Sequence, residues 1–259
     1  MLTTYASYRL VAADLDRSMQ RAASEPVAAR EIAYWKENIG EVKSIDDLVG
    51  DRRLFAFAMK AFGLGDMAYA KAFVRKILEG GVADEASMAN RLADPRYRQF
   101  AKTFDFARLG PFTTGMPEVK TEVVDKYLRQ SLEESAGATN EGVRLALYFQ
   151  RKAGELTSPM QVLADPALLK VVQTAFSLPA SMSSASIDKQ AEMIAGKIDV
   201  ATLKDPAVLE RTLKRFSALH DLSSGAAVAA SPALAINAAA GQGVGVDTLM
   251  SLARLKTGG

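Results

Sequence analysis

The chain has 259 residues, of which 49% are hydrophobic and 24% are charged, enough to bury a core in one or two domains. Its formal net charge is only +2, with both signs interspersed, so neither a nucleic acid nor an anionic membrane is indicated as a partner. It contains no cysteine, which excludes disulfides, thiolate catalysis and cysteine metal sites.

The sequence predicts neither a secretory signal peptide nor a transmembrane segment. The segment Met1–Leu10 has no basic stretch before an apolar core, so we expect no cleavable secretory signal peptide. No apolar run approaches the ~18 residues that span a bilayer, so we expect no transmembrane segment. A cytoplasmic location is the default prediction, and export by a route that does not cleave its signal is the alternative.

A unit that begins with aspartate and ends with phenylalanine recurs along the chain. Its copies are Asp51–Phe62, Asp165–Phe176, Asp205–Phe216 and, more loosely, Asp94–Phe104. At about 100° per residue, eleven residues bring the phenylalanine back to the face of the aspartate after three turns. Each unit is therefore expected to be a helix whose aspartate caps its start and whose phenylalanine contacts the core.

Apolar periodicity predicts helices throughout the first half of the chain. One long helix is expected over 3–23, with an apolar stripe that faces either the core or another chain. Ser24 is the predicted N-cap of a second helix, which ends at Gly40. Further helices are expected, in order, over 45–49, 51–62, 66–79, 84–92 and 94–104.

A central helical hairpin follows a loop rich in glycine and proline, Leu109–Pro117. Its first helix is expected over 118–135, ended by Gly137. Its second is expected through Lys152, with Asn140 or Thr139 as its N-cap. The pattern places polar residues outside and apolar residues inside this hairpin.

The second half of the chain repeats the first. The offset is 114 residues between Asp51 and Asp165 and 111 between Asp94 and Asp205, which indicates an internal duplication. The predicted fold is all-α, with two related helical halves of short orthogonal helices around the central hairpin. The expected segments are N-terminal helices (1–43), a first half (44–110), the hairpin (111–157), a second half (158–222) and a flexible Ala/Gly-rich tail (223–259) with a short helix at 246–255.

The candidate catalytic and metal-binding residues are better explained as structural. His220 is the one histidine of the chain and lies near a helix end, so it lacks the partners of a triad or a metal site. The aspartates of the repeated unit lie at helix starts, where capping explains them. No strand precedes the glycines of the segment 241–245, so no nucleotide loop is indicated.

A second set of charged residues is also more simply structural. Glu133 and Glu134 lie near a helix C-terminus, which hints at an ion pair with a basic residue such as Arg144. Arg52, Arg53, Arg96 and Arg98 are interpreted as solvated helix faces. We therefore predict no catalytic residues, no cofactor-binding residues, no metal ligands and no enzymatic activity.

Several stretches match a known family pattern, among them Ala58–Leu64, Asp66–Phe73, Asp94–Arg98 and Asn140–Phe149. Over residues 3–222 the chain resembles an alphaproteobacterial family of unknown function whose members occur among flagellar genes. The resemblance implies an all-helical protein tied to the flagellum and brings no known catalytic residues.

We therefore consider three hypotheses for the function of the protein. The first is a non-enzymatic flagellum-associated protein, structural or interacting, that binds flagellar proteins through its helices and has no nucleic-acid partner. The second is a cytoplasmic regulator or chaperone of flagellar export and assembly. The third is a hydrolase that uses helix-borne carboxylates such as Glu31, Glu133 and Glu134.

Overall fold

The computed structural model describes residues 2–224, and this part of the chain is all-α, without a strand. Its α-helices are α1 (Thr4–Ala12), α2 (Leu15–Ser24), α3 (Pro26–Asn38), α4 (Ile45–Gly50), α5 (Arg52–Ala61), α6 (Lys71–Gly80), α7 (Met88–Arg91), α8 (Pro95–Thr103), α9 (Phe106–Leu109), α10 (Val123–Thr139), α11 (Glu141–Ala153), α12 (Pro159–Leu163), α13 (Pro166–Ala175), α14 (Ile187–Ala195) and α15 (Pro206–Ser223). Short helical turns complete it: η1 (Ile39–Glu41), η2 (Gly65–Met67), η3 (Gly110–Gly115), the π-turn η4 (Glu118–Glu122), η5 (Ala180–Ser184) and η6 (Val200–Lys204). The predicted fold class is confirmed.

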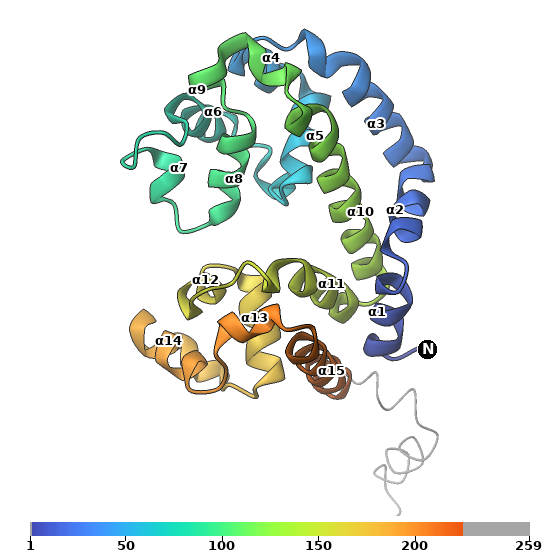
Figure 1. Cartoon of the computed structure of the whole chain (residues 1–259), viewed down its shortest axis with the longest axis vertical. Coiled ribbons are helices and arrows are strands. Elements are labelled where there is room, and N and C mark those ends of the chain that lie inside the picture. Colours follow the sequence, from blue (N-terminus) through green and yellow to red (C-terminus); the bar gives the residue numbers. More distant parts are fainter. Residues whose placement is uncertain (1, 225–259) are drawn as a thin grey trace, which may run out of the picture.

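The helices form two lobes that are joined along one side (Figure 1). Helices α3 to α9 make the first lobe, and α11 to α15 make the second. Helix α10 packs against α5 in the first lobe and against α11 at the start of the second, so it bridges the two. Helix α1 packs on α11 and α15, and α2 packs on α10 and α3.

Each lobe has its own hydrophobic core, because the apolar faces of its short helices converge. In the first lobe, Trp35 stacks on Phe57 at 4.7 Å between ring centroids, and Phe57 stacks on Tyr127 at 4.0 Å. The fully buried Phe149 and Phe216 belong to the second core, which Tyr8 of α1 also joins. The two halves are thus packed separately and share α10 as their connection.

The aspartates of the repeated unit are helix caps, as predicted. The Asp51 side chain accepts hydrogen bonds from the amides of Arg53 and Leu54, at 2.8 and 2.9 Å. Asp165 does the same for the amides of residues 167 and 168, and Asp205 accepts from the amide of residue 207. Asp94 caps α8 through the amide of Arg96.

Two further details recur at the offset of 114 residues. The hydroxyl of Tyr34 donates to Asp51 at 2.7 Å, and the hydroxyl of Tyr148 donates to Asp165 at 2.5 Å. Gly63 and Ser177 both have positive φ, at 69° and 51°. They lie where the backbone leaves α5 and α13, respectively. An internal duplication predicts such paired details, and the duplication itself stays a prediction.

The N-terminal helices differ from the expectation. Residues 3–23 do not form one helix: α1 ends at Ala12 and α2 begins at Leu15, capped by Asp14. Ser24 is the last residue of α2 instead of an N-cap, and Glu25 precedes α3 without a side-chain cap.

Four other boundaries were also wrong. The helix expected over 84–92 is only one turn, α7. The helix expected over 66–79 is split into η2 and α6, with Ala70 before α6. Gly137 lies inside α10, which ends at Thr139 because the side chain of the next residue, Asn140, caps α11. The N-terminal turn of the helix expected from 118 is the π-turn η4.

The end of the repeated unit varies. Phe62, Phe104 and Phe216 are buried, whereas Phe176 is only partly buried against the second core. Phe176 therefore contacts its core, as predicted, but is less buried than the phenylalanines of the other copies. The short helix expected at 246–255 and the tail beyond 224 lie outside the described residues.

Candidate binding cleft

A cleft separates the two lobes on the side away from α2. It consists of three adjoining pockets of about 420, 510 and 420 Å³ that share Arg96 and Tyr148. One wall is formed by α8 and the end of α5, and the other by α11, α12 and α13. Helix α10 contributes Gln130 and Lys126 where the walls meet.

Basic residues predominate in the lining of the cleft. Eight basic residues line it against four acidic ones. The basic set is Arg96, Arg98, Lys102, Lys126, Arg144, Arg151, Lys152 and Lys170, and the acidic set is Glu122, Glu141, Glu155 and Asp165. Since the whole chain carries only +2, the positive charge is concentrated here.

Arg96 is held rigidly at the first wall. Its guanidinium pairs with Asp94 at 2.8 Å and also donates to the carbonyl of Gly63. The positive φ of Gly63 favours glycine and aims that carbonyl, and a Cβ there would lie 3.5 Å from the same guanidinium. Arg96 is therefore a fixed positive group whose orientation is set by the first lobe.

Tyr148 and Asp165 form the corresponding polar pair on the second wall. The Tyr148 ring lies 5.0 Å from the Arg151 guanidinium carbon, which places a cation near its face. Burial, together with the charge of Asp165 and the hydrogen bond to it, raises the pKa of Tyr148 above the usual range of a phenol. This hydroxyl is therefore protonated at neutral pH and donates a hydrogen bond to Asp165.

Some cationic side chains of the cleft are free to bind a ligand. Lys126, Lys152 and Arg144 form ion pairs with Glu122, Glu155 and Glu141. Lys102 and Lys170 form no ion pair within residues 2–224. Arg98 donates to the side-chain oxygen of Asn90 and has no carboxylate partner among the residues described. The cleft can therefore attract and pair with carboxylates.

The acids that motivated the hydrolase hypothesis do not converge. Glu31 pairs with Arg53 at 3.0 Å, and Glu134 pairs with Lys60 at 2.9 Å, both at the surface. Glu133 is buried between Arg129 and Arg151, so the expected pairing with Arg144 was wrong; Arg144 pairs with Glu141. Each acid is thus held by a basic residue and is not placed to act on a substrate.

His220 lies at the lining of the cleft and packs against its neighbours. Its ring lies 5.5 Å from the Phe216 ring and packs against the backbone of Gly142 at the start of α11. Within the described chain, no group of three potential metal ligands gathers around it or anywhere else. No described helix is long and apolar enough to cross a membrane.

Sequence reasoning did not find the cleft. Arg96 and Arg98 were interpreted as a solvated face. Arg98 is exposed, as that interpretation predicts, whereas Arg96 is partly buried, and both line the cleft. Tyr148 was not singled out. The available signal was the density of basic residues at 96–102 and 151–152, and nothing in the sequence shows that these segments face one another.

Comparison with known proteins identifies the family. The model of a protein family of unknown function, DUF1217, matches residues 61–209. The chain belongs to this family. No curated protein matches it. An X-ray crystal structure of an Agrobacterium tumefaciens protein, from a structural genomics consortium, is 45% identical, with a TM-score of 0.78. That match covers 86% of this chain and 97% of the Agrobacterium protein.

Proposed function

We propose that this DUF1217 protein is a non-enzymatic binding protein whose basic cleft takes an acidic segment of a partner protein. The observation that carries the proposal is the excess of basic over acidic residues in a cleft between two separately packed lobes. Cations placed without carboxylate partners attract an acidic chain and set its rate of association. Helix α8 supplies two of these groups, Arg98 and Lys102, and α13 supplies Lys170.

A protein partner suits the cleft better than a nucleic acid. Nucleic-acid grooves combine a basic track with exposed aromatic rings on which bases stack. Here Tyr148 is partly buried and its hydroxyl is held by Asp165, and four acidic side chains interrupt the basic lining. Alternating charges of this kind match an acidic polypeptide that also carries a few basic residues.

The flagellum is the proposed setting. This part of the proposal comes from the family resemblance and from the association of that family with flagellar genes. The partner is then a flagellar component, bound during assembly or in the assembled structure. A strictly cytoplasmic regulator or chaperone of flagellar export is the second candidate, because an acidic segment of an export substrate would fit the same cleft.

A charge-reversal experiment tests the cleft. A photo-crosslinking amino acid at Gln99, on the cleft wall, is expected to capture a flagellar protein in cells. Lys102→Glu is expected to abolish that crosslink and to reduce motility, whereas Lys204→Glu, an exposed residue outside the cleft, leaves both unchanged. A Lys102→Glu protein that crosslinks like the wild type overturns the role of the cleft.

Deletion and fractionation test the setting. Deleting the gene is expected to impair motility or flagellar structure, and normal flagella in its absence would rule out the flagellar role. Co-purification with intact flagella supports an assembled component. A strictly cytoplasmic protein that still crosslinks through Gln99 supports the chaperone. Unchanged motility after substitution of Glu31, Glu133 and Glu134 removes the hydrolase alternative.

A further inference from the structure

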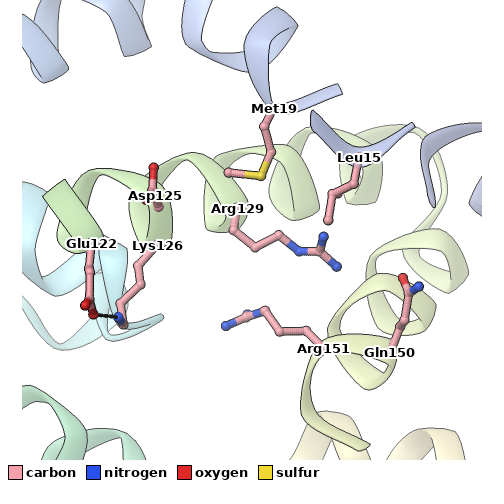
Figure 2. A pocket seen from close by; sticks show the side chains of 8 residues that line it. All are labelled: Leu15, Met19, Glu122, Asp125, Lys126, Arg129, Gln150 and Arg151. Atoms are coloured by element: carbon pink, nitrogen blue, oxygen red, sulfur yellow. Dashed lines mark hydrogen bonds and ion pairs between the residues drawn. The ribbon is translucent and has the colours of Figure 1, made fainter. Parts of the chain in front are cut away.

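A second cavity lies between α2, α10 and α11 and adjoins the cleft, with which it shares Glu122, Lys126 and Arg151. Its volume is about 530 Å³, and Leu15, Met19, Arg129, Gln150 and Arg151 are among the side chains around it. Figure 2 shows Arg129 and Arg151 reaching across this space from different helices, with Leu15 and Met19 on the side of α2. The cavity is thus polar at one side and apolar at the other.

The polar side carries an excess of one positive charge. Glu133 is 1% exposed and accepts from both arginines: Arg129 Nε at 2.9 Å, Arg151 Nε at 2.9 Å and Arg151 Nη2 at 2.8 Å. The Arg129 side chain is itself only 9% exposed, so water contributes little to stabilising the charges of Arg129 and Glu133. Two guanidinium groups therefore share one carboxylate in a largely buried place, which favours a second anion beside them.

Both arginines keep donors for such an anion. Arg129 uses Nε for Glu133 and Nη2 for the carbonyl of Leu147, and Arg151 uses Nε and Nη2 for Glu133. The Nη1 group of each makes no hydrogen bond with residues 2–224. A guanidinium has five N–H donors, so each arginine can still bind a carboxylate oxygen.

The nearby acidic side chains do not neutralise the excess positive charge of Arg129 and Arg151. Glu122 pairs with Lys126, as the dashed line in Figure 2 marks. Asp125 is exposed, and in Figure 2 its carboxylate points away from the two guanidinium groups. The excess charge of the arginine pair is therefore directed into the cavity.

The apolar side limits what the anion can be. Leu15 and Met19, one turn apart on α2, present an apolar surface that a methionine can fit to an irregular shape.

We infer that this cavity binds a small organic acid with two parts: a carboxylate on Arg129 and Arg151, and an apolar body against Leu15 and Met19. N-acylated amino acids have this chemistry. A phosphate ester suits the site less well, because a dianion exceeds the single excess charge. The site shares Arg151 with the cleft but differs from it in ligand class, and its occupation by a small acid can be measured without the protein partner of the proposed function.

Calorimetric titration of the full chain with N-acetyl-leucine tests the inference. Saturable binding is expected for N-acetyl-leucine but not for N-acetyl-leucine amide, which lacks the carboxylate, or for acetate, which lacks the apolar body. All titrations use the same ionic strength, because a simple charge effect would respond to salt. Equal binding of the amide, or no saturable binding of the acid, overturns the inference.

Matched variants locate the site. Arg151→Gln is expected to weaken binding about tenfold or more, the scale of a lost charge-assisted hydrogen bond. Leu15→Ala keeps the arginine pair intact and removes part of the apolar lining, so it is expected to weaken binding of the same probe about tenfold, which covers the case that Arg151→Gln fails to fold. Arg211→Gln, at an exposed residue of α15, leaves binding unchanged. Wild-type affinity in a folded Leu15→Ala or Arg151→Gln protein overturns the assignment.

Discussion

At the scale of single residues, Asp165 performs two functions at once. Its Oδ1 atom caps α13 through two amides, and its Oδ2 atom accepts the hydroxyl of Tyr148 on the cleft wall. Asp205 caps α15 through one amide and is exposed. Asp165 and Asp205 occupy the same position of the repeated unit, but they are therefore expected to contribute differently to the free energy of unfolding.

We predict that Asp165→Ala lowers the free energy of unfolding by about 1–2 kcal/mol, because a cap and a partly buried hydrogen bond are lost together. Asp205→Ala is expected to cost about 1 kcal/mol, the scale of a cap alone. Urea denaturation of the two variants measures the difference. Equal losses would show that the Tyr148 contact adds nothing to stability.

Tyr148 is expected to make stability depend on alkaline pH. Its pKa is raised in the folded protein, so above the unfolded value of about 10 the folded state binds more protons than the unfolded state. The stability that Tyr148 contributes is therefore complete below pH 10 and is lost as pH rises toward the folded pKa. Tyr148→Phe removes this dependence.

The corresponding measurement is urea denaturation at several pH values between 8 and 11. Wild type is expected to exceed Tyr148→Phe in stability at pH 8, and the difference is expected to shrink as the pH rises above about 10. Tyr69→Phe, at a residue that is 80% exposed, is the control. A difference between wild type and Tyr148→Phe that stays constant over this range would contradict the role of the raised pKa.

At the scale of elements, the described termini are joined at one junction. The amide of Thr4 donates to Asp221 at 3.0 Å, and its hydroxyl donates to the same carboxylate, which is buried. Gly142 at the start of α11 lies beneath both the Thr4 and His220 side chains. Helix α1 is therefore packed into the second lobe, which favours the core-facing interpretation of its apolar stripe.

Gly142→Ala is predicted to destabilise the protein by about 1–3 kcal/mol, the usual range for overpacking. An added Cβ would lie 2.6 Å from His220 Nδ1 and 2.8 Å from Thr4 Cγ2, so one of these side chains must move. Gly154→Ala, with no atom within 4 Å of the added Cβ, is expected to stay within about 0.5 kcal/mol of wild type.

Thermal denaturation of both variants checks this prediction. Hydrogen exchange adds a local measurement, since displacement of Thr4 is expected to increase exchange of the α1 amides in Gly142→Ala alone. If the two glycine variants were equally stable, α1, α11 and α15 would not be tightly coupled at this junction.

At the scale of the whole molecule, α10 connects the two lobes and contributes residues to both binding surfaces. It packs on α5 of the first lobe and on α11 of the second, and its residues reach both cavities. Gln130 lines the cleft, Arg129 lines the second cavity, and Lys126 lines both. Because residues 126–130 turn through a little more than one helical turn, one short segment contributes to two surfaces of different chemistry.

Local signals in the sequence were sufficient for the fold class and for the helix starts at Asp51, Asp94, Asp165 and Asp205. Capping depends on one side chain and on amides two or three residues away, so it can be predicted without tertiary information. The break between α1 and α2 was missed although Asp14 is a cap residue, because the apolar stripe continues across it.

Only the tertiary structure decided the partners of the charged groups and the location of the binding surfaces. Glu133 is four residues from Arg129 but eighteen from Arg151, and the cleft joins residues from α8 and α13 that are far apart in the chain. Whether Phe176 is buried like Phe216 also depended on packing between helices. The physical reason is range: caps and periodicity act within a few residues, whereas cavities and ion-pair networks depend on how whole helices are placed.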